Sequence, residues 1–128
     1  MIKKFIIALL IFLAIDALWL GFIAKNLYKK ELGSIMKNNV DFLTAGLTYF
    51  VLVIGIIFFV LPKAGDSVLL ALLWGGLLGL VVYGVYDLTN LAVINNYSLK
   101  IALIDWVWGI FICGTTSYLT VLVTNLIR

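Results

Sequence analysis

The chain has 128 residues, of which 65% are hydrophobic and 12% are charged. A soluble domain carries about 25% charged residues, so this composition favours a membrane protein over a helical subunit buried in a larger complex. The net charge of +3 comes from Lys and Arg between the apolar runs, which suits membrane lipids as partners and excludes a nucleic-acid-binding surface. The chain has no histidine and a single cysteine, Cys113. These counts exclude an intrachain disulfide, a His/Cys zinc site and a histidine-based triad, and we expect no cofactor.

Four apolar runs follow one another along the chain. A membrane-spanning helix needs about 20 mostly apolar residues, and the runs cover roughly residues 5–25, 42–61, 67–94 and 101–126. The first run follows two lysines, as a signal peptide does. We expect it to be retained, because it is long, contains Asp16 and is not followed by a cleavage site. We expect Pro62 to close the second run. The sequence thus predicts one all-α domain, a compact bundle of four transmembrane helices.

The longest connection, residues 26–41, mixes lysines with apolar residues at spacings that one helical face could hold. A short interfacial helix and an ordinary charged loop explain this pattern equally well. Lys and Arg number five on the side of this connection and four on the side of the termini, so orientation is weakly encoded. The bias favours a cytoplasmic 26–41 connection, and its small size leaves dual insertion and a homodimer open.

Three acidic residues, Asp16, Asp87 and Asp105, lie within the predicted spans. Each charged residue near a helix centre costs about 3 kcal/mol to insert. At 1.5 Å per residue, these three lie roughly 13, 11 and 6 Å from span ends that face one side of the membrane. We therefore expect all three in the same leaflet, where neighbouring helices could bring them together.

The helical period places polar and small residues on shared faces. On the third span, Gly76, Gly79, Tyr83, Asp87 and Asn90 fall within about 80° of one another. Small residues allow close packing between membrane helices, and the packing residues that we expect are Ala71, Gly75, Gly76, Gly79 and Gly109. No Lys or Arg lies deep within the spans. Hydrogen bonds that only hold the bundle together and a functional cavity are both compatible with this pattern.

Three segments resemble a known family when taken in order: "IDALWLG" (15–21), "YGVYDLTNLA" (83–92) and "IDWVWG" (104–109). Together they are similar to a group of small bacterial integral-membrane proteins catalogued as domain of unknown function 2177. The resemblance covers essentially the whole chain. It implies a multi-pass protein of the bacterial inner membrane without an established activity. The signature positions that it implies are Asp16, Trp19, Gly21, Tyr86, Asp87, Thr89, Asn90, Asp105, Trp108 and Gly109.

Three functions fit these residues. The first is a cavity that binds or carries a small lipophilic or cationic ligand, with or without proton coupling. The second is a lipid-modifying enzyme that uses paired aspartates, with any metal held by oxygen ligands alone. The third is an accessory or scaffold subunit. We interpret Tyr28 and Tyr97 as residues of the membrane-interface belt. The candidate ligand or proton site comprises Asp16, Trp19, Tyr83, Tyr86, Asp87, Thr89, Asn90, Asp105 and Trp108.

Overall fold

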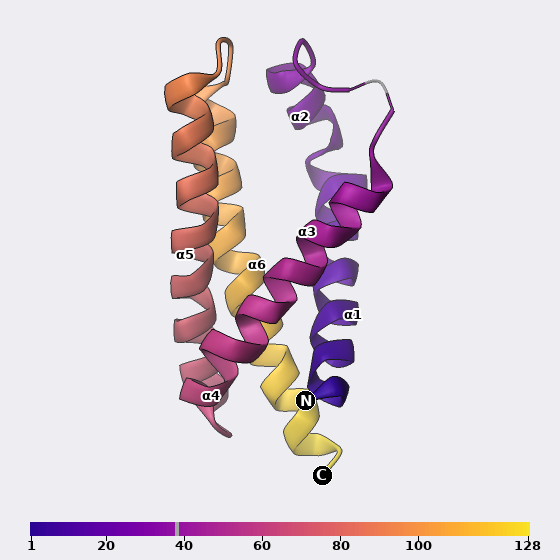
Figure 1. The fold of residues 1–128 in the computed structure, drawn as a ribbon, viewed down its shortest axis with the longest axis vertical. Helices are drawn as coiled ribbons and strands as arrows, with labels where there is room; N and C mark the ends of the chain where they lie inside the picture. The colour runs from indigo at the N-terminus through magenta and orange to yellow at the C-terminus, as the bar shows by residue number, and fades with distance from the viewer. Residues whose placement is uncertain (38) are drawn as a thin grey trace.

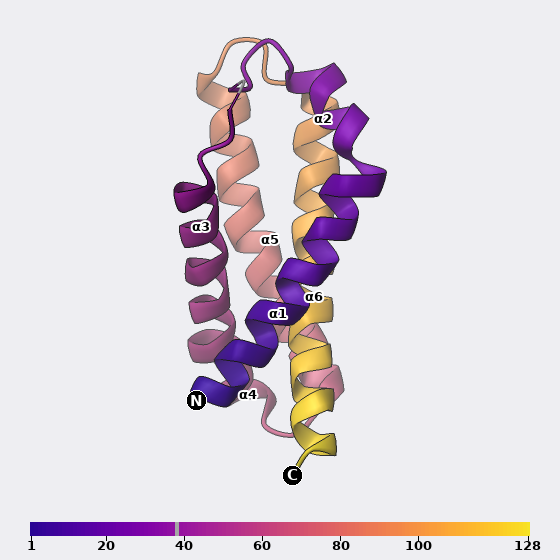
Figure 2. The same ribbon diagram turned by 90° about the vertical axis from the view of Figure 1, so that its right-hand side faces the viewer.

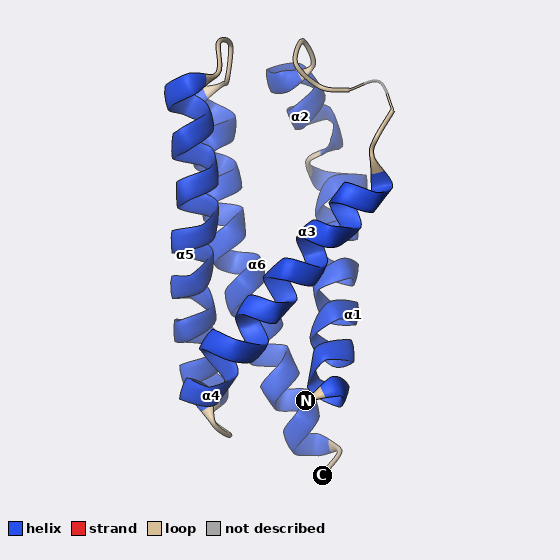
Figure 3. Ribbon diagram, in the orientation of Figure 1, coloured by secondary structure: helices blue, strands red, loops and turns tan. Residues whose placement is uncertain are grey.

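The computed structural model describes residues 1–37 and 39–128, and these residues form helices and connecting turns without a strand (Figure 3). Helix accounts for 84% of the structure. Four helical segments are long and apolar enough to cross a membrane: Ile2–Ile23, Phe42–Ala64, Val68–Val93 and Leu99–Leu126. The predicted all-α fold with four spans is confirmed. Two of the observed span ends coincide with the expected ones, and the others differ by one to three residues.

The long helices run alternately up and down (Figures 1 and 2). Both termini and the turn before α5 (Val68–Val93) lie at one end, which we call the terminal end. Helix α2 (Lys25–Leu32) and the hairpin between α5 and α6 (Leu99–Leu126) lie at the other end, the hairpin end. The first and second spans begin as α1 (Ile2–Leu18) and α3 (Phe42–Gly55). Helix α3 diverges from α5 toward the hairpin end (Figure 1).

Helices α5 and α6 form the closest pair in the bundle because glycines lie at their contact. A Cβ atom added to Gly79 would lie 2.2 Å from the carbonyl oxygen of Gly109, and one added to Gly75 would lie 2.6 Å from that of Cys113. Ala71, on the same face of α5, is fully buried. The close approach of two backbones in a bilayer depends on such small residues.

The first span contains a short π-helical segment, η1 (Trp19–Ile23), before the chain continues as α2. The N–H of Ala24 donates to the carbonyl of Trp19 at 2.7 Å, which is the i to i+5 bond of a π turn. Helix α2 therefore follows α1 at the hairpin end rather than starting as a separate element (Figure 2). Each of the two interpretations of the 26–41 connection holds for one part of it. The first part is helical, and the described remainder is a loop.

The second span does not end at Pro62, which corrects the expectation from the sequence. The chain passes through a π-helical segment, η2 (Ile56–Val60), and continues as α4 (Leu61–Ala64). Proline has no N–H to donate to the preceding turn, and the wider π turn lies directly before it. The helix ends at Gly65, whose φ of 57° is accessible to glycine without steric cost.

The apolar core lies toward the terminal end. It includes the fully buried side chains of Phe12 from α1, Val53 from α3, Ile56 from η2 and Ile112 from α6. These side chains hold α1 and α3 against α6. Asp16, Asp87 and Asp105 lie nearer the hairpin end, whereas the buried polar residues Thr116, Ser117 and Thr120 lie in the later half of α6, toward the terminal end.

Candidate functional site

Asp16 joins three helices through its carboxyl group. Its side chain is only 8% exposed. One oxygen, Oδ2, accepts a hydrogen bond from the hydroxyl of Tyr49 on α3. The other, Oδ1, accepts from the indole Nε1 of Trp108 on α6 at 3.1 Å. Both carboxyl oxygens are therefore satisfied by donors from different elements.

Asp105 is reached by a hydrogen-bond chain from the first span. The hydroxyl of Tyr28 on α2 donates to Oδ1 of Asp105 at 2.6 Å and accepts from Nε1 of Trp19 at 3.3 Å. Burial and the neighbouring Asp105 carboxylate raise the pKa of Tyr28. The tyrosine hydroxyl consequently keeps its proton and acts as a donor to the carboxyl group.

Asp87 is the most deeply buried of the three acids, with 0% of its side chain exposed. Its Oδ1 accepts from the hydroxyl of Tyr97 in the α5–α6 hairpin at 3.0 Å. Burial raises the pKa of Tyr97, so this hydroxyl also remains protonated. The second oxygen of Asp87, Oδ2, has no donor among the described residues. The contact of Tyr83 with Gly109 lies one helical turn from Asp87 on α5 and from Asp105 on α6, so these two acids occupy facing turns of the packed pair.

The acids form two groups that aromatic residues connect. Asp87 and Asp105 lie on facing turns of α5 and α6, whereas Asp16 is bound separately by Tyr49 and Trp108. The indole of Trp108 stacks on that of Trp19, with ring centroids 4.3 Å apart and an angle of 10° between the planes. No group of three His, Cys, Asp or Glu residues in the described part of the chain is arranged to hold a metal ion.

A groove of about 560 Å³ lies between α3 and α5. Asp105 is the one charged residue among those that line it. Tyr83 and Tyr86 of α5 contribute aromatic surface, and Thr44 and Thr48 of α3 contribute hydroxyl groups. The remaining lining residues are apolar: Leu47, Val51, Leu52 and Val82. The groove therefore presents a carboxyl group within a mainly apolar and aromatic wall.

The other candidate residues occupy different positions. The ring of Tyr83 packs on Gly109, where a Cβ atom would lie 2.0 Å from the ring. Asn90 is partly buried on α5, one helical turn from Tyr86. Thr89 is exposed and makes no hydrogen bond among those of the described residues, so the structure does not bring it to the carboxyl groups. Gly76 faces Ile110 at ordinary packing distance.

Three tyrosines that bind the carboxyl groups were missed by sequence reasoning. Tyr28 and Tyr97, interpreted from the sequence as belt residues, have a further role, because their hydroxyls donate to Asp105 and Asp87. Tyr49 was not singled out, although it lies within an apolar span where a phenol hydroxyl needs a partner. That need was the available signal for Tyr49. Tyr28 and Tyr97 give no such signal, because water or lipid headgroups near a span end could accept a hydrogen bond from their hydroxyls equally well.

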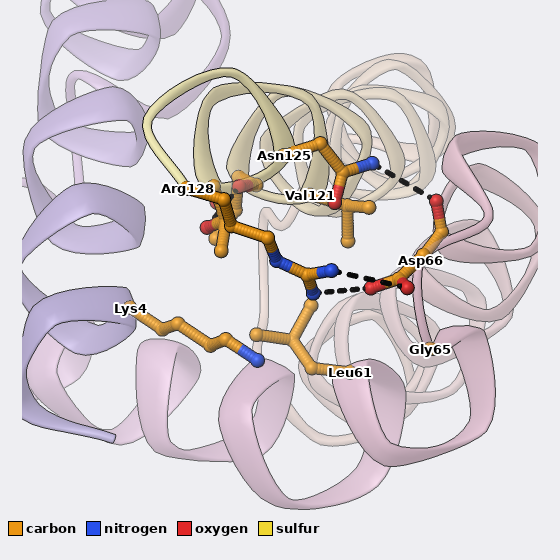
Figure 4. A pocket seen from close by; sticks show the side chains of 9 residues that line it. Lys4, Leu61, Gly65, Asp66, Val121, Asn125 and Arg128 are labelled. Atoms are coloured by element: carbon orange, nitrogen blue, oxygen red, sulfur yellow. Dashed lines mark hydrogen bonds and ion pairs between the residues drawn. The ribbon is translucent and has the colours of Figure 1, made fainter.

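A second cavity lies at the terminal end (Figure 4). There the guanidinium of Arg128 binds both carboxyl oxygens of Asp66, and Nδ2 of Asn125 donates to the carbonyl of Asp66 at 3.0 Å. The arginine holds the pKa of Asp66 below its ordinary value. This cavity has a volume of about 10 Å³, which is room for about one water molecule. Its contacts connect the turn between α4 and α5 to the C-terminal end of α6, and it is not a ligand site.

A protein family described as "predicted membrane protein (DUF2177)" matches residues 1–122. The chain belongs to this family. The resemblance seen in the three sequence segments is thereby confirmed, and the family description agrees with the four membrane-spanning helices. No curated protein and no solved structure matches the chain.

Proposed function

We propose that this membrane protein binds a small lipophilic cation in the groove between α3 and α5. The ligand enters sideways from the bilayer, and its positive charge pairs with Asp105. The observation that carries the proposal is the placement of a partly exposed carboxyl group in an apolar groove of about 560 Å³. Small-molecule sites typically have volumes of about 300–1,000 Å³ and apolar walls with few polar groups.

The charges around the groove support a cationic ligand. The ion pairs among the described residues are Lys100 with Glu31 and Arg128 with Asp66. Asp105 therefore has a tyrosine donor but no basic partner. A lipophilic cation would supply the missing charge. It would also contact the rings of Tyr83 and Tyr86, and cations are attracted to aromatic faces.

The geometry supports a lipid-modifying enzyme less well. An acid and base pair must both reach the reacting atoms. Asp105 lines the groove, whereas Asp87 is completely buried beside it. An accessory role would use the same hydrogen bonds only to hold the bundle together, and it needs no ligand in the groove.

We further propose that the protein resides in the inner membrane of a bacterium, as the family resemblance implies. Its α-helical spans satisfy their backbone hydrogen bonds internally, which suits a lipid bilayer. Lipids would then be its immediate partners, and the homodimer stays a prediction.

Binding of tetraphenylphosphonium to the purified protein in detergent, measured by isothermal titration calorimetry, tests the proposal. We expect saturable binding that Asp105→Asn weakens at least about tenfold, because an amide carries no charge to pair with the cation. Thr48→Trp should also weaken binding by filling the groove while leaving Asp105 in place. Asp66→Asn removes a carboxylate at the far end and should bind as the wild type does.

Thermal unfolding of each variant establishes that it is folded. A wild-type protein that shows no saturable binding, or a folded Asp105→Asn variant with wild-type affinity, would contradict a cation site in this groove.

A further inference from the structure

The two oxygens of Asp87 have different surroundings. Oδ1 has the Tyr97 hydroxyl as its donor, but Oδ2 is buried without one. A buried polar atom that lacks a partner costs about 1–3 kcal/mol. Tyr83 of α5 packs on Gly109 of α6, and one helical turn from that contact toward the hairpin lie Asp87 on α5 and Asp105 on α6. Two carboxyl groups on facing turns can form a hydrogen bond only when one of them carries a proton.

Among the described residues, no ion pair or hydrogen bond joins a basic side chain to Asp87 or Asp105. Tyr28 from α2, Tyr97 from the hairpin, and Tyr83 and Tyr86 from α5 are the titratable side chains that face it. All four are tyrosines, and α3 faces the groove with threonines. The nearest ion pair, Lys100 with Glu31 at 3.8 Å, is neutral as a unit. Two adjacent carboxylates without a cation would repel each other strongly in such surroundings.

We propose that Asp87 is a protonated positioning residue whose carboxyl group donates a hydrogen bond to the Asp105 carboxylate. The pair then carries one negative charge, which lies on Asp105 at the groove. The different burial of the two acids supports this assignment, because the charge is less costly on the partly exposed Asp105 than on the fully buried Asp87.

This arrangement specifies what the groove accepts. A single negative charge is neutralised by a monovalent cation, so the preferred ligand is a monocation with apolar substituents rather than a dication. This ligand preference rests on the proposed function, whereas the proton on Asp87 can be tested without any ligand.

Infrared spectroscopy of the protein at neutral pH tests the proton directly, since a protonated carboxyl group has its own C=O stretching band. We expect the wild type to show this band and Asp87→Asn to lack it. Asp16→Asn is the control and should retain the band, because Asp16 belongs to the separate group. A wild type without the band, or a folded Asp87→Asn variant that keeps it, overturns the proposal.

Tetraphenylphosphonium binding supplies a second readout. The amide of Asp87→Asn can donate to Asp105 as a protonated carboxyl does, so its affinity should stay within about threefold of the wild type. Asp87→Ala removes the donor and supplies no other, so its affinity should fall below this threefold range. Asp87→Asn that binds as weakly as Asp105→Asn overturns the inference. A wild type that shows the infrared band but no binding contradicts the proposed function alone.

Discussion

A carboxyl group inside a membrane-spanning helix costs about 3 kcal/mol to insert, and here each of three such groups has a tyrosine donor from another element. Tyr49 serves Asp16, Tyr97 serves Asp87, and Tyr28 serves Asp105. Tyrosine suits this role because its ring packs well against apolar side chains while its hydroxyl supplies one strong donor. The arrangement stabilises the carboxyl groups without a basic residue in the bilayer.

Single glycines determine how closely α5 and α6 approach. Gly79→Ala would place a methyl group 2.2 Å from the carbonyl oxygen of Gly109, so the two backbones would have to move apart. Overpacking of this kind costs about 1–3 kcal/mol. We therefore expect a lower midpoint of thermal unfolding for the variant in detergent micelles.

Gly46→Ala is the matched control for this prediction. Gly46 also lies inside a helix, and a Cβ atom added to it meets nothing within 4 Å. This control should unfold at or slightly above the wild-type midpoint, since alanine is the better helix former. Equal midpoints for both variants would mean that the α5–α6 contact is looser than the structure indicates.

At the scale of elements, α3 begins with a charged cap. Asp41 accepts from the N–H of Thr44 at 3.2 Å and from its hydroxyl at 2.7 Å. The hydroxyl and N–H of Thr44 lower the pKa of Asp41. A lowered folded-state pKa means that the cap stabilises the helix above the ordinary aspartate pKa and is lost as pH falls through the lowered value.

Hydrogen exchange of the amides in the first turn of α3 measures this cap. We expect Asp41→Ala to exchange faster than the wild type near neutral pH, with the difference disappearing at low pH as the wild-type carboxylate is protonated. Ser98 caps α6 through an uncharged hydroxyl. The effect of Ser98→Ala on the first turn of α6 should therefore be independent of pH. A difference at Asp41 that persists unchanged at low pH would contradict a charged cap.

The sequence predicts the elements better than their interruptions. Apolar runs of about 20 residues define spans because the bilayer has a fixed thickness. The π-helical segments at Trp19–Ile23 and Ile56–Val60 leave no such pattern, since they depend on what the helix packs against. The same holds for the tyrosine partners. Tyr28 and Asp105 are 77 residues apart, so their contact depends on how helices cross, which hydropathy does not encode.

At the scale of the whole molecule, the four spans place both termini at one end and the α5–α6 hairpin at the other (Figure 1). The hairpin end carries Lys25, Lys29, Lys30, Lys37 and Lys100, whereas the terminal end carries Lys3, Lys4, Lys63 and Arg128. Positive charge favours the cytoplasmic side. The excess of a single basic residue points to a cytoplasmic hairpin end.

A membrane-impermeant maleimide applied to intact cells tests this orientation. We expect Ile2→Cys to react and Asn95→Cys to react only after lysis, since the two exposed positions lie at opposite ends. The native Cys113 is fully buried, so the wild type serves as the unlabelled control. Equal labelling of both variants in intact cells would instead show that the chain inserts in both orientations.

The hydrogen bond between Asp16 and Trp108 spans 92 residues of chain, which has a consequence for biosynthesis. Ribosomes make the N-terminus first, so α1 meets the bilayer before the helix that carries Trp108 exists. Tyr49, 33 residues after Asp16, is the first of its two partners to be synthesised. The final packed position of α1 also includes contacts with α6. The helix that is made first can therefore reach its finished position only after the last helix has been made.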